Sequence, residues 1–428
     1  MKTPMPAAPR LARIAFALLV ALPAVVGLSQ DDTAKSWRLF EADPEMLAYR
    51  KELREGLFGE PSKAFLERTA LPQLAQPANR GTIDRVRRRM RETLCGDASG
   101  DRKAAEAAMR VVLDFMARLA RDQQADPVVR VNAMLLVGEL RSGDQKPWPP
   151  AAAVLAEAIG DARLPAAVRI AAAAGLDRHV EAAGKSLAPT VGPVLVKVLE
   201  NPVPTVDPVA AAWLAARCLD MLGTLGPAAP PPAAAAAAKI FTDAASPPDL
   251  RVRAAAALGR MAASTAGVDF AGTPDVVRAE ARSMLEADRA EADRWRLRRR
   301  VERPAANATR PVPGDGGGET ATPLMPLACR RTAWRLAMLA DALLAADGTS
   351  GIGLAAGADR QAAADLAATL RQAATDIDAS PDETSIEAAL AALAGVPAPA
   401  AESPPATEQP AAPAPPPADS PFTSPFGN

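Results

Sequence analysis

One spacing of apolar residues recurs four times between residues 129 and 261, and it constrains the fold more than any other feature of the sequence. The spacing occupies positions i, i+4, i+7, i+8 and i+11, which lie on one face of an α-helix. We call these five positions the template, and the copies begin at residues 129, 168, 214 and 250. The distance from the start of one copy to the start of the next fits a helix, a turn, a second helix and a return loop. The four copies are Val129, Ala133, Leu136, Val137, Leu140; Val168, Ala172, Gly175, Leu176, His179; Leu214, Cys218, Met221, Leu222, Leu225; and Leu250, Ala254, Ala257, Leu258, Met261.

The residues between the copies fit a second set of helices. Asp126-Pro127 and Asp207-Pro208 place a capping carboxylate before a proline at the first helical position, where the missing N–H has no cost. The aromatic content is only 4% and alanine is abundant, which favours helices over strands. We therefore expect an all-α fold, with partner helices between the template helices and a divergent pair upstream. The partner helices are predicted over Ala151–Ile159, Val191–Leu199, Ala233–Phe241 and Val276–Glu291, and the upstream pair over Ile83–Leu94 and Ala104–Leu119.

Two other positions recur with the template. Three copies carry arginine at i+1 and three carry glycine at i+9. We expect both sets to be structural, with the arginines bonded to cap carboxylates or carbonyls between adjacent repeats; ligand binding is the alternative. They are Arg130, Arg169 and Arg251, and Gly138, Gly223 and Gly259.

Two strings carry a resemblance to a known family. "DPVVRVNAMLLVGEL" (Asp126–Leu140) and "DLRVRAAAALGRM" (Asp249–Met261) are similar to the first helix of HEAT-like repeats of the phycobilisome-lyase type. The second copy departs from the pattern at Asp177, and the third lacks the arginine. The resemblance covers residues 80–293 and implies an α-solenoid of about five helix pairs. It implies little about activity, because such repeats serve unrelated functions.

The sequence predicts six segments. We expect a secretory signal over 1–29, an N-terminal capping segment over 30–80 and the HEAT-like α-solenoid over 81–300. A flexible loop over 301–325 contains Gly316-Gly317-Gly318. A small C-terminal helical module follows over 326–395, where Ser380-Pro381-Asp382-Glu383 predicts a capping box. The Pro/Ala-rich residues 396–428 are expected to be a disordered tail, with Phe422 and Phe426 as an alternative docking motif.

The N-terminal segment is typical of exported proteins. Lys2, Arg10 and Arg13 precede the apolar run Ile14–Leu28, and small residues follow it. We expect export to a bacterial periplasm or cell envelope, with an uncleaved anchor as the alternative. No later run of uncharged residues is long enough for a membrane span, so no transmembrane anchor is expected after cleavage. Removing three basic residues lowers the formal charge from −1 to −4, too little for a general polyanion binder.

Few residues are suited to catalysis or metal binding. The chain has one histidine, His179, which stands at a template position and is expected to pack rather than to catalyse. Cys95, Cys218 and Cys329 are far apart, so they form at most one disulfide or remain buried thiols. The acidic pairs Asp31-Asp32 and Asp376/Asp378 come with no second element that would complete a pocket. No cofactor or metal is predicted.

Two arginine clusters could bind an anionic partner. The first is Arg85, Arg87, Arg88, Arg89 and Arg91; the second is Arg294, Arg296, Arg298, Arg299 and Arg300, with Trp295 among them. The alternative is that both are solvated helix faces, and the second cluster would also favour a helix C-terminus. Nucleic acid is not expected outside the cytoplasm.

These observations predict a non-catalytic scaffold that binds a protein of the cell envelope. We expect a right-handed α-solenoid whose concave face, lined by the second helices, holds the partner. One alternative is an accessory or regulatory subunit of an exported enzyme complex. Another is a lyase- or hydrolase-like enzyme that uses carboxylates in the groove.

Overall fold

The computed structural model describes residues 40–95, 102–142, 145–202, 207–261, 272–306, 324–355 and 358–395. Over these residues the chain is helical and contains no strand beyond an isolated bridge between Arg141 and Pro147. The predicted all-α fold is therefore confirmed. The predicted signal (1–29), the tail (396–428) and most of the predicted loop (301–325) lie outside the described residues.

The chain divides into two compact units at Trp148–Pro149. In the first unit, the end of the predicted capping segment contains two 3₁₀ segments, Leu71–Ala75 and Pro77–Thr82. They follow a π-helical segment, Leu66–Ala70. The α-helices of this unit are α2 (Pro44–Arg54), α3 (Glu60–Phe65), α4 (Ile83–Met90), α5 (Arg102–Arg121) and α6 (Pro127–Glu139).

The second unit holds the remaining helices and three copies of the template. They are α7 (Pro149–Gly160), α8 (Ala166–Ala183), α9 (Ala188–Glu200), α10 (Pro208–Leu225), α11 (Pro232–Thr242), α12 (Pro248–Met261), α13 (Thr273–Ala306), α14 (Leu324–Leu343), α15 (Arg360–Ala379) and α16 (Glu383–Leu393).

Every residue of the four template copies is buried, Gly175 and His179 included. The copies lie on α6, α8, α10 and α12, and α6 and α10 begin as their Asp-Pro pairs predict. Asp126 Oδ1 accepts from Val128 N at 2.8 Å, and Asp207 Oδ1 accepts from Val209 N at 2.9 Å. The template therefore marks the core face of each helix.

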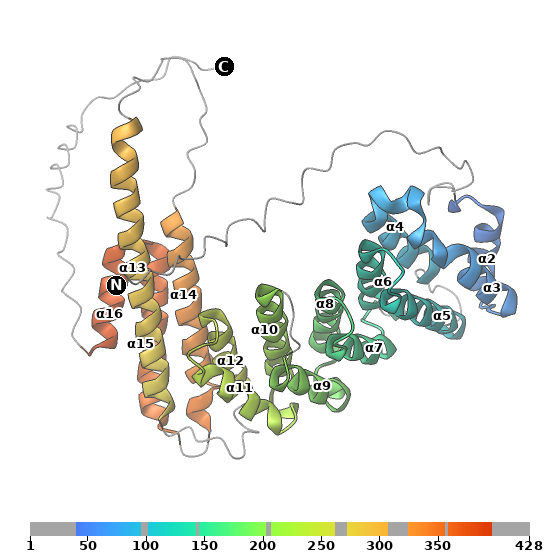
Figure 1. Cartoon of the computed structure of the whole chain (residues 1–428). Helices are drawn as coiled ribbons and strands as arrows, with labels where there is room; N and C mark the ends of the chain where they lie inside the picture. The colour runs from blue at the N-terminus through green and yellow to red at the C-terminus, as the bar shows by residue number, and fades with distance from the viewer. Residues whose placement is uncertain are drawn as a thin grey trace, which may run out of the picture. The chain divides into compact units, whose positions relative to one another are not determined.

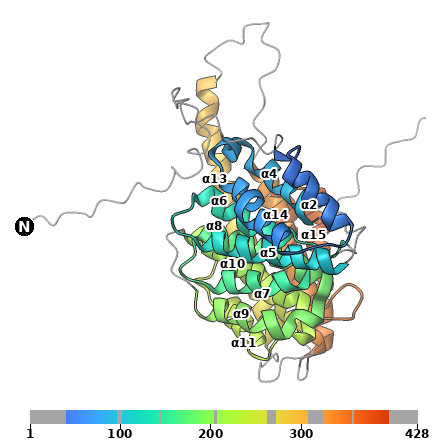
Figure 2. The same cartoon turned by 90° about the vertical axis from the view of Figure 1, so that its right-hand side faces the viewer.

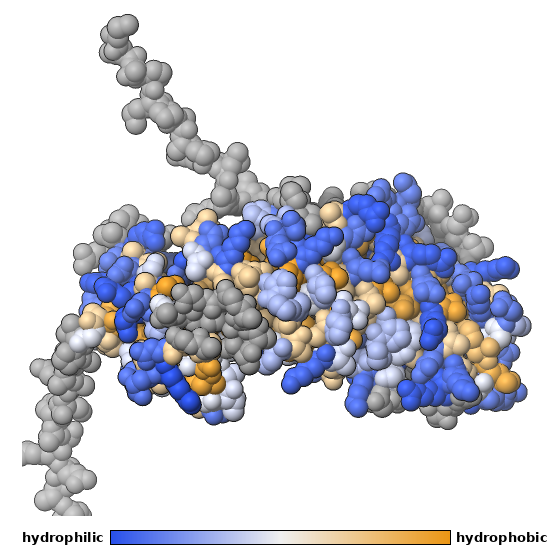
Figure 3. Space-filling view, turned by 90° about the horizontal axis from the view of Figure 1, so that it is seen from below, coloured by the Kyte–Doolittle hydropathy of each residue, from blue (hydrophilic) through white to orange (hydrophobic). Residues whose placement is uncertain are grey.

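The helices of the second unit pack in two rows (Figures 1 and 2). One row contains α8, α10, α12 and α14, each packed on the next; the other contains α7, α9 and α11. Each partner helix also packs against the template helix that follows it, as α7 does against α8. The rows bury their apolar faces against each other. On the face seen in Figure 3, polar and apolar side chains are interspersed.

The C-terminal helices continue this packing. α14 packs on α12, and Thr332, Leu336, Leu339, Ala340 and Leu343 repeat the template spacing and are all 0% exposed. α15 packs on α14, and α16 packs on α13 and α15. The template row therefore extends beyond the four copies found in the sequence.

Two helix boundaries differ from those expected. α13 runs over 34 residues, well past the expected Val276–Glu291, because its Arg- and Glu-rich second half favours a helix. α16 begins at Glu383 rather than at Pro381: Asp382 is its N-cap and accepts from Ser385 N at 2.9 Å.

One described helix is long and apolar enough to cross a membrane by length and composition alone. It is Pro208–Ala228, which contains α10. It carries Arg217 and Asp220, and α10 packs against α8, α9 and α12 within the second unit. This packing accounts for its apolar character.

Candidate functional site

Two of the recurrent arginines each donate a hydrogen bond to a backbone carbonyl at the C-terminal end of the preceding helix. Arg130 Nε donates to the carbonyl of Ala120 (3.1 Å), and Arg169 Nε donates to that of Ile159 (2.8 Å). Both guanidinium groups are buried, and both acceptors lie in the last turn of the preceding helix, where carbonyls lack intrahelical donors. The hydrogen-bond partners of both arginines are therefore backbone groups of the fold itself.

Arg251 makes a different contact. Its Nη1 lies 2.5 Å from Glu280 Oε2 on α13, and both side chains are largely buried. Burial raises the pKa of Glu280, and Arg251 opposes this rise. Arg251 therefore joins α12 to α13 through an ion pair.

The position i+9 faces the next template helix. A Cβ on Gly259 would lie 2.5 Å from the carbonyl oxygen of Ala342 in α14, and one on Gly223 would lie 3.3 Å from the Cα of Ala257 in α12. In the second copy the same position holds Asp177, whose carboxylate lies 3.7 Å from Arg217 Nη1 of α10. Gly138, at this position of the first copy, is buried in α6.

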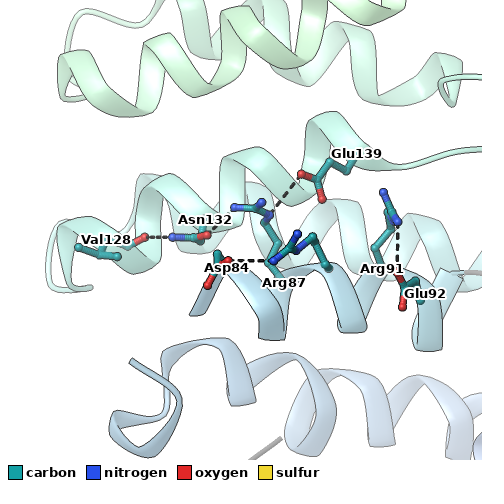
Figure 4. Close-up of polar contacts among 8 residues, drawn as sticks. Asp84, Arg87, Arg91, Glu92, Val128, Asn132 and Glu139 are labelled. Atoms are coloured by element: carbon teal, nitrogen blue, oxygen red, sulfur yellow. Dashed lines mark hydrogen bonds and ion pairs between the residues drawn. The ribbon is translucent and has the colours of Figure 1, made fainter. Parts of the chain in front are cut away.

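The first arginine cluster is largely neutralised within its own unit (Figure 4). Arg87 reaches from α4 to α6, where Nη1 donates to Asn132 Oδ1 (2.6 Å) and Nε lies 3.3 Å from Glu139. Arg88 pairs with Asp84, and Arg89 and Arg91 both pair with Glu92. Four of the five arginines thus have carboxylate partners, which argues against an anion-binding patch here.

The second cluster lies on α13. Arg294 is exposed, and its Nε donates to the carbonyl of Ala290 at 3.2 Å. The side chains of Arg296, Arg298, Arg299 and Arg300 lie outside those that the structure describes. An anionic partner at this cluster stays a prediction.

The residues considered for catalysis do not come together. His179 is 1% exposed, and burial lowers its pKa to about 4, with Arg178 adding to the effect. Burial raises the pKa of the Cys218 thiol to about 12, and Cys329 is a second buried free thiol. Asp376 and Asp378 lie on the last turns of α15, and Asp31-Asp32 lies outside the described residues. Among the residues described, no cluster of three or more His, Cys, Asp or Glu could hold a metal ion.

A cleft on the template row is the best candidate for a binding site. It has a volume of about 480 Å³ and lies between α10, α12 and α14. We call it the Trp cleft. Its charged and larger apolar lining residues are Val209, Trp213, Arg217, Asp249, Leu250, Arg253, Arg331 and Trp334. It lies on the template helices and not on the partner helices, where binding was expected.

Arginines lie over both indole rings of the Trp cleft. The guanidinium carbon of Arg217 is 5.2 Å from the ring centroid of Trp213, and that of Arg253 is 5.1 Å from that of Trp334. At these distances a cation is attracted by the negative face of the ring. Both tryptophans are partly exposed, and Val209 at the edge is 74% exposed. The cleft therefore presents apolar surface to solvent beside fixed positive charges.

A ladder of ion pairs fixes these arginines. Asp220 of α10 lies 2.6 Å from Arg253 and 3.5 Å from Arg217, and Asp177 of α8 lies 3.7 Å from Arg217. Asp249 accepts from Arg335 Nε at 2.7 Å. The ladder joins four consecutive template helices and orients the groups around the tryptophans before anything binds.

A second pocket, of about 350 Å³, lies in the first unit beside α2 and α3. Its lining includes Glu45, Glu52 and Ser62, and Ser62 Oγ donates to Glu52 Oε2 at 2.5 Å. It is the only one of the two pockets to contain two carboxylates. The single carboxylate of the Trp cleft is bonded to Arg335.

No sequence motif pointed directly to the Trp cleft. Its key residues lie on the exposed sides of α10, α12 and α14, where the apolar spacing carries no information. One signal was present: the third and fourth copies both have arginine at i+3, as Arg217 and Arg253. Trp334 comes from α14, which lies beyond the copies that the sequence revealed.

Comparison of the chain with known protein families, curated proteins and solved structures found no match.

Proposed function

We propose that this protein is a non-catalytic scaffold built as an α-solenoid of about five HEAT-like helix pairs, and that it binds a protein partner at the Trp cleft. The observation that carries this proposal is the pair of partly exposed tryptophans, each beneath an arginine held by the ladder. Tryptophan and arginine dominate the energetics of protein interfaces, where they sit in pockets that exclude water. The resemblance of the template strings to HEAT-like repeats supports the solenoid.

The chemistry of the cleft favours a binding surface over an active site. Its one carboxylate is bonded to an arginine, and two of its three arginines, Arg217 and Arg253, are both ion-paired and stacked on rings. These groups are positioned to orient a ligand, and no nucleophile stands beside a base. The alternative of a lyase- or hydrolase-like enzyme would have to use the pocket with Glu45 and Glu52.

A second proposal concerns location. The basic lead and apolar run of residues 1–29 support export to the periplasm or cell envelope, where the partner would reside. Leu18→Arg should interrupt the apolar run and keep the chain in the cytoplasm with its full mass. The unaltered chain should appear in the envelope fraction at the mass of residues 30–428. Finding the unaltered chain in the cytosol at full length would refute export.

Binding is tested by affinity capture with the whole chain from an envelope extract. The double variant Trp213→Ala/Trp334→Ala should lose at least tenfold of a partner that the unaltered chain recovers reproducibly. Val276→Ala, at an exposed apolar residue on α13, is the matched control and should retain it. Thermal melting checks that each variant folds.

Two outcomes would count against the scaffold. One is that no partner is recovered reproducibly; the other is that the double variant retains every partner while melting normally. If the partner proves to be an exported enzyme whose activity changes on binding, the protein is an accessory or regulatory subunit, which is the alternative role.

A further inference from the structure

The Trp cleft has the features of a surface that recognises proline-rich peptides. Aromatic side chains line one opening, and the ring planes of prolines in an extended polyproline helix stack on such surfaces with little loss of entropy. Trp213 and Trp334 supply the rings from α10 and α14. Because both are partly exposed and Val209 is 74% exposed, the cleft leaves apolar area uncovered by described residues.

The charges of the cleft favour an acidic ligand. Arg217, Arg253 and Arg331 line it, against the single carboxylate of Asp249. The nearby Asp220 and Asp177 offset much of this excess, because Asp220 pairs with Arg253 and Arg217 and Asp177 pairs with Arg217. Arg331 is the lining arginine that keeps the cleft positive. Arg331 is exposed, and Asp249 is already bonded to Arg335. The expected ligand is therefore a proline-rich segment with a few acidic residues and not a polyanion.

The chain itself contains such a segment. Residues 396–428 include eleven prolines, Glu402, Glu408 and Asp419, and no basic residue. They also contain Pro421-Phe422 and Pro425-Phe426, two aromatic groups able to pack against an indole. We propose that residues 396–428 occupy the Trp cleft of the same molecule and shield it from other ligands. This inference rests on the proposed binding role of the cleft.

The length of the segment is sufficient. It follows α16, which packs on α15, and α15 packs on α14, the helix that carries Trp334. About thirty residues in polyproline form reach on the order of 90 Å, whereas a 20-residue helix such as α14 is about 30 Å long. The segment can therefore reach the cleft along more than one path.

Tethering makes even weak binding effective. A flexible link of this length gives an effective concentration on the order of 1 mM, so a segment with a dissociation constant of about 100 µM would be mostly bound. An outside partner must then displace it. The cleft would respond only to partners that are abundant or that bind more tightly than the segment does.

The test uses a fluorescein-labelled synthetic peptide with the sequence of residues 396–428 and measures its binding by fluorescence anisotropy. The first protein is the whole chain. The second is the whole chain with Glu402→Gln, Glu408→Gln, Asp419→Asn, Phe422→Ala and Phe426→Ala, which weakens its own segment but keeps its length. The peptide should bind the second protein at least tenfold more tightly than the first, and raising the salt concentration from about 0.05 to 0.5 M should weaken this binding.

Two further variants locate the binding. In the background of the second protein, Trp213→Ala/Trp334→Ala should abolish peptide binding, and Val276→Ala should leave it unchanged. Arg331→Glu changes an exposed charge without removing buried surface, so it remains informative if the double variant does not fold. It should weaken peptide binding by at least fivefold.

Any other result of these binding measurements overturns the proposal. Equal peptide binding by the first two proteins would mean that the cleft is open in the single molecule; if light scattering then shows self-association, the occupant is the segment of a second copy. No peptide binding to either protein excludes the segment as a ligand. In that case capture of a partner by the cleft, measured separately, decides whether the proposed function survives.

Discussion

His179 occupies the last template position of α8, where the other three copies have Leu140, Leu225 and Met261. The side chain is 1% exposed and its Nε2 has no hydrogen-bond partner among the described groups. Burial holds its pKa at about 4. The folded protein therefore holds a neutral imidazole at a position suited to leucine. The cost of this in free energy of unfolding depends on pH.

His179→Leu should therefore stabilise the protein more in acid than at neutral pH. The unfolded chain binds a proton at His179 below about pH 6.5, whereas the folded chain binds it only near pH 4. Stability from the neutral imidazole is complete above pH 6.5 and is lost as the pH falls toward 4. The advantage of the variant in free energy of unfolding should grow by roughly 2–3 kcal/mol between pH 7.5 and 4.5.

Urea titrations of both proteins across this range measure the difference. Asp288, whose pKa burial raises to about 6, has the opposite effect, because the folded state binds its proton more readily. Subtracting wild type from variant removes this contribution. A difference independent of pH would show that His179 is solvated in the folded protein.

Arg169 supplies a second prediction at the residue scale. Its side chain is 1% exposed, and its Nε caps the carbonyl of Ile159. Arg169→Ala should lower the free energy of unfolding by about 3 kcal/mol, because it leaves a cavity and an unpaired carbonyl. Arg163→Ala, which removes an exposed ion pair with Asp161, is the control and should change nothing measurable. Similar losses in both variants would contradict the capping role.

At the scale of the helix, the predictable parts and the unpredictable parts have different physical origins. The template predicted α6, α8, α10 and α12, because helical period and capping are local properties of the sequence. It did not predict that α14 joins the row, since that copy begins with a threonine and follows the long α13. The Trp cleft could not be predicted either: its tryptophans lie on solvent-facing sides of helices that are distant in sequence.

The close approach of neighbouring template helices predicts unequal effects of two similar substitutions. Gly259→Ala would place a methyl group 2.5 Å from the carbonyl oxygen of Ala342, which only a backbone movement can relieve. It should cost about 2–3 kcal/mol of stability. Gly223→Ala meets Ala257 at 3.3 Å, where a small adjustment is enough, and should cost less. Thermal or urea unfolding measures both, and an equal cost would mean that α12 and α14 are not held in close contact.

At the scale of the molecule, the chain forms two compact units. In the second unit each template helix packs against its neighbours in the row and against the helix that precedes it in the chain, so a local loss of stability should spread through these contacts. The helices beside α12 should therefore respond first to a defect at Gly259.

Hydrogen exchange of Gly259→Ala checks this. Amide protection should fall in α10, α11, α12 and α14, while α2 and the other helices of the first unit exchange as in the unaltered chain. The exchange of α5 is a convenient internal standard. A uniform loss of protection across both units would show that they unfold as one.

The two indoles of the Trp cleft come from helices separated by α11, α12 and α13. This separation determines the order in which the two tryptophans are synthesised. A chain that leaves the ribosome from its N-terminus exposes Trp213 first, and Trp334 follows on the order of ten seconds later. During that interval only half of the cleft exists. A ligand that needs both rings can therefore bind only chains that have been made at least as far as α14, so the cleft distinguishes these chains from shorter nascent ones.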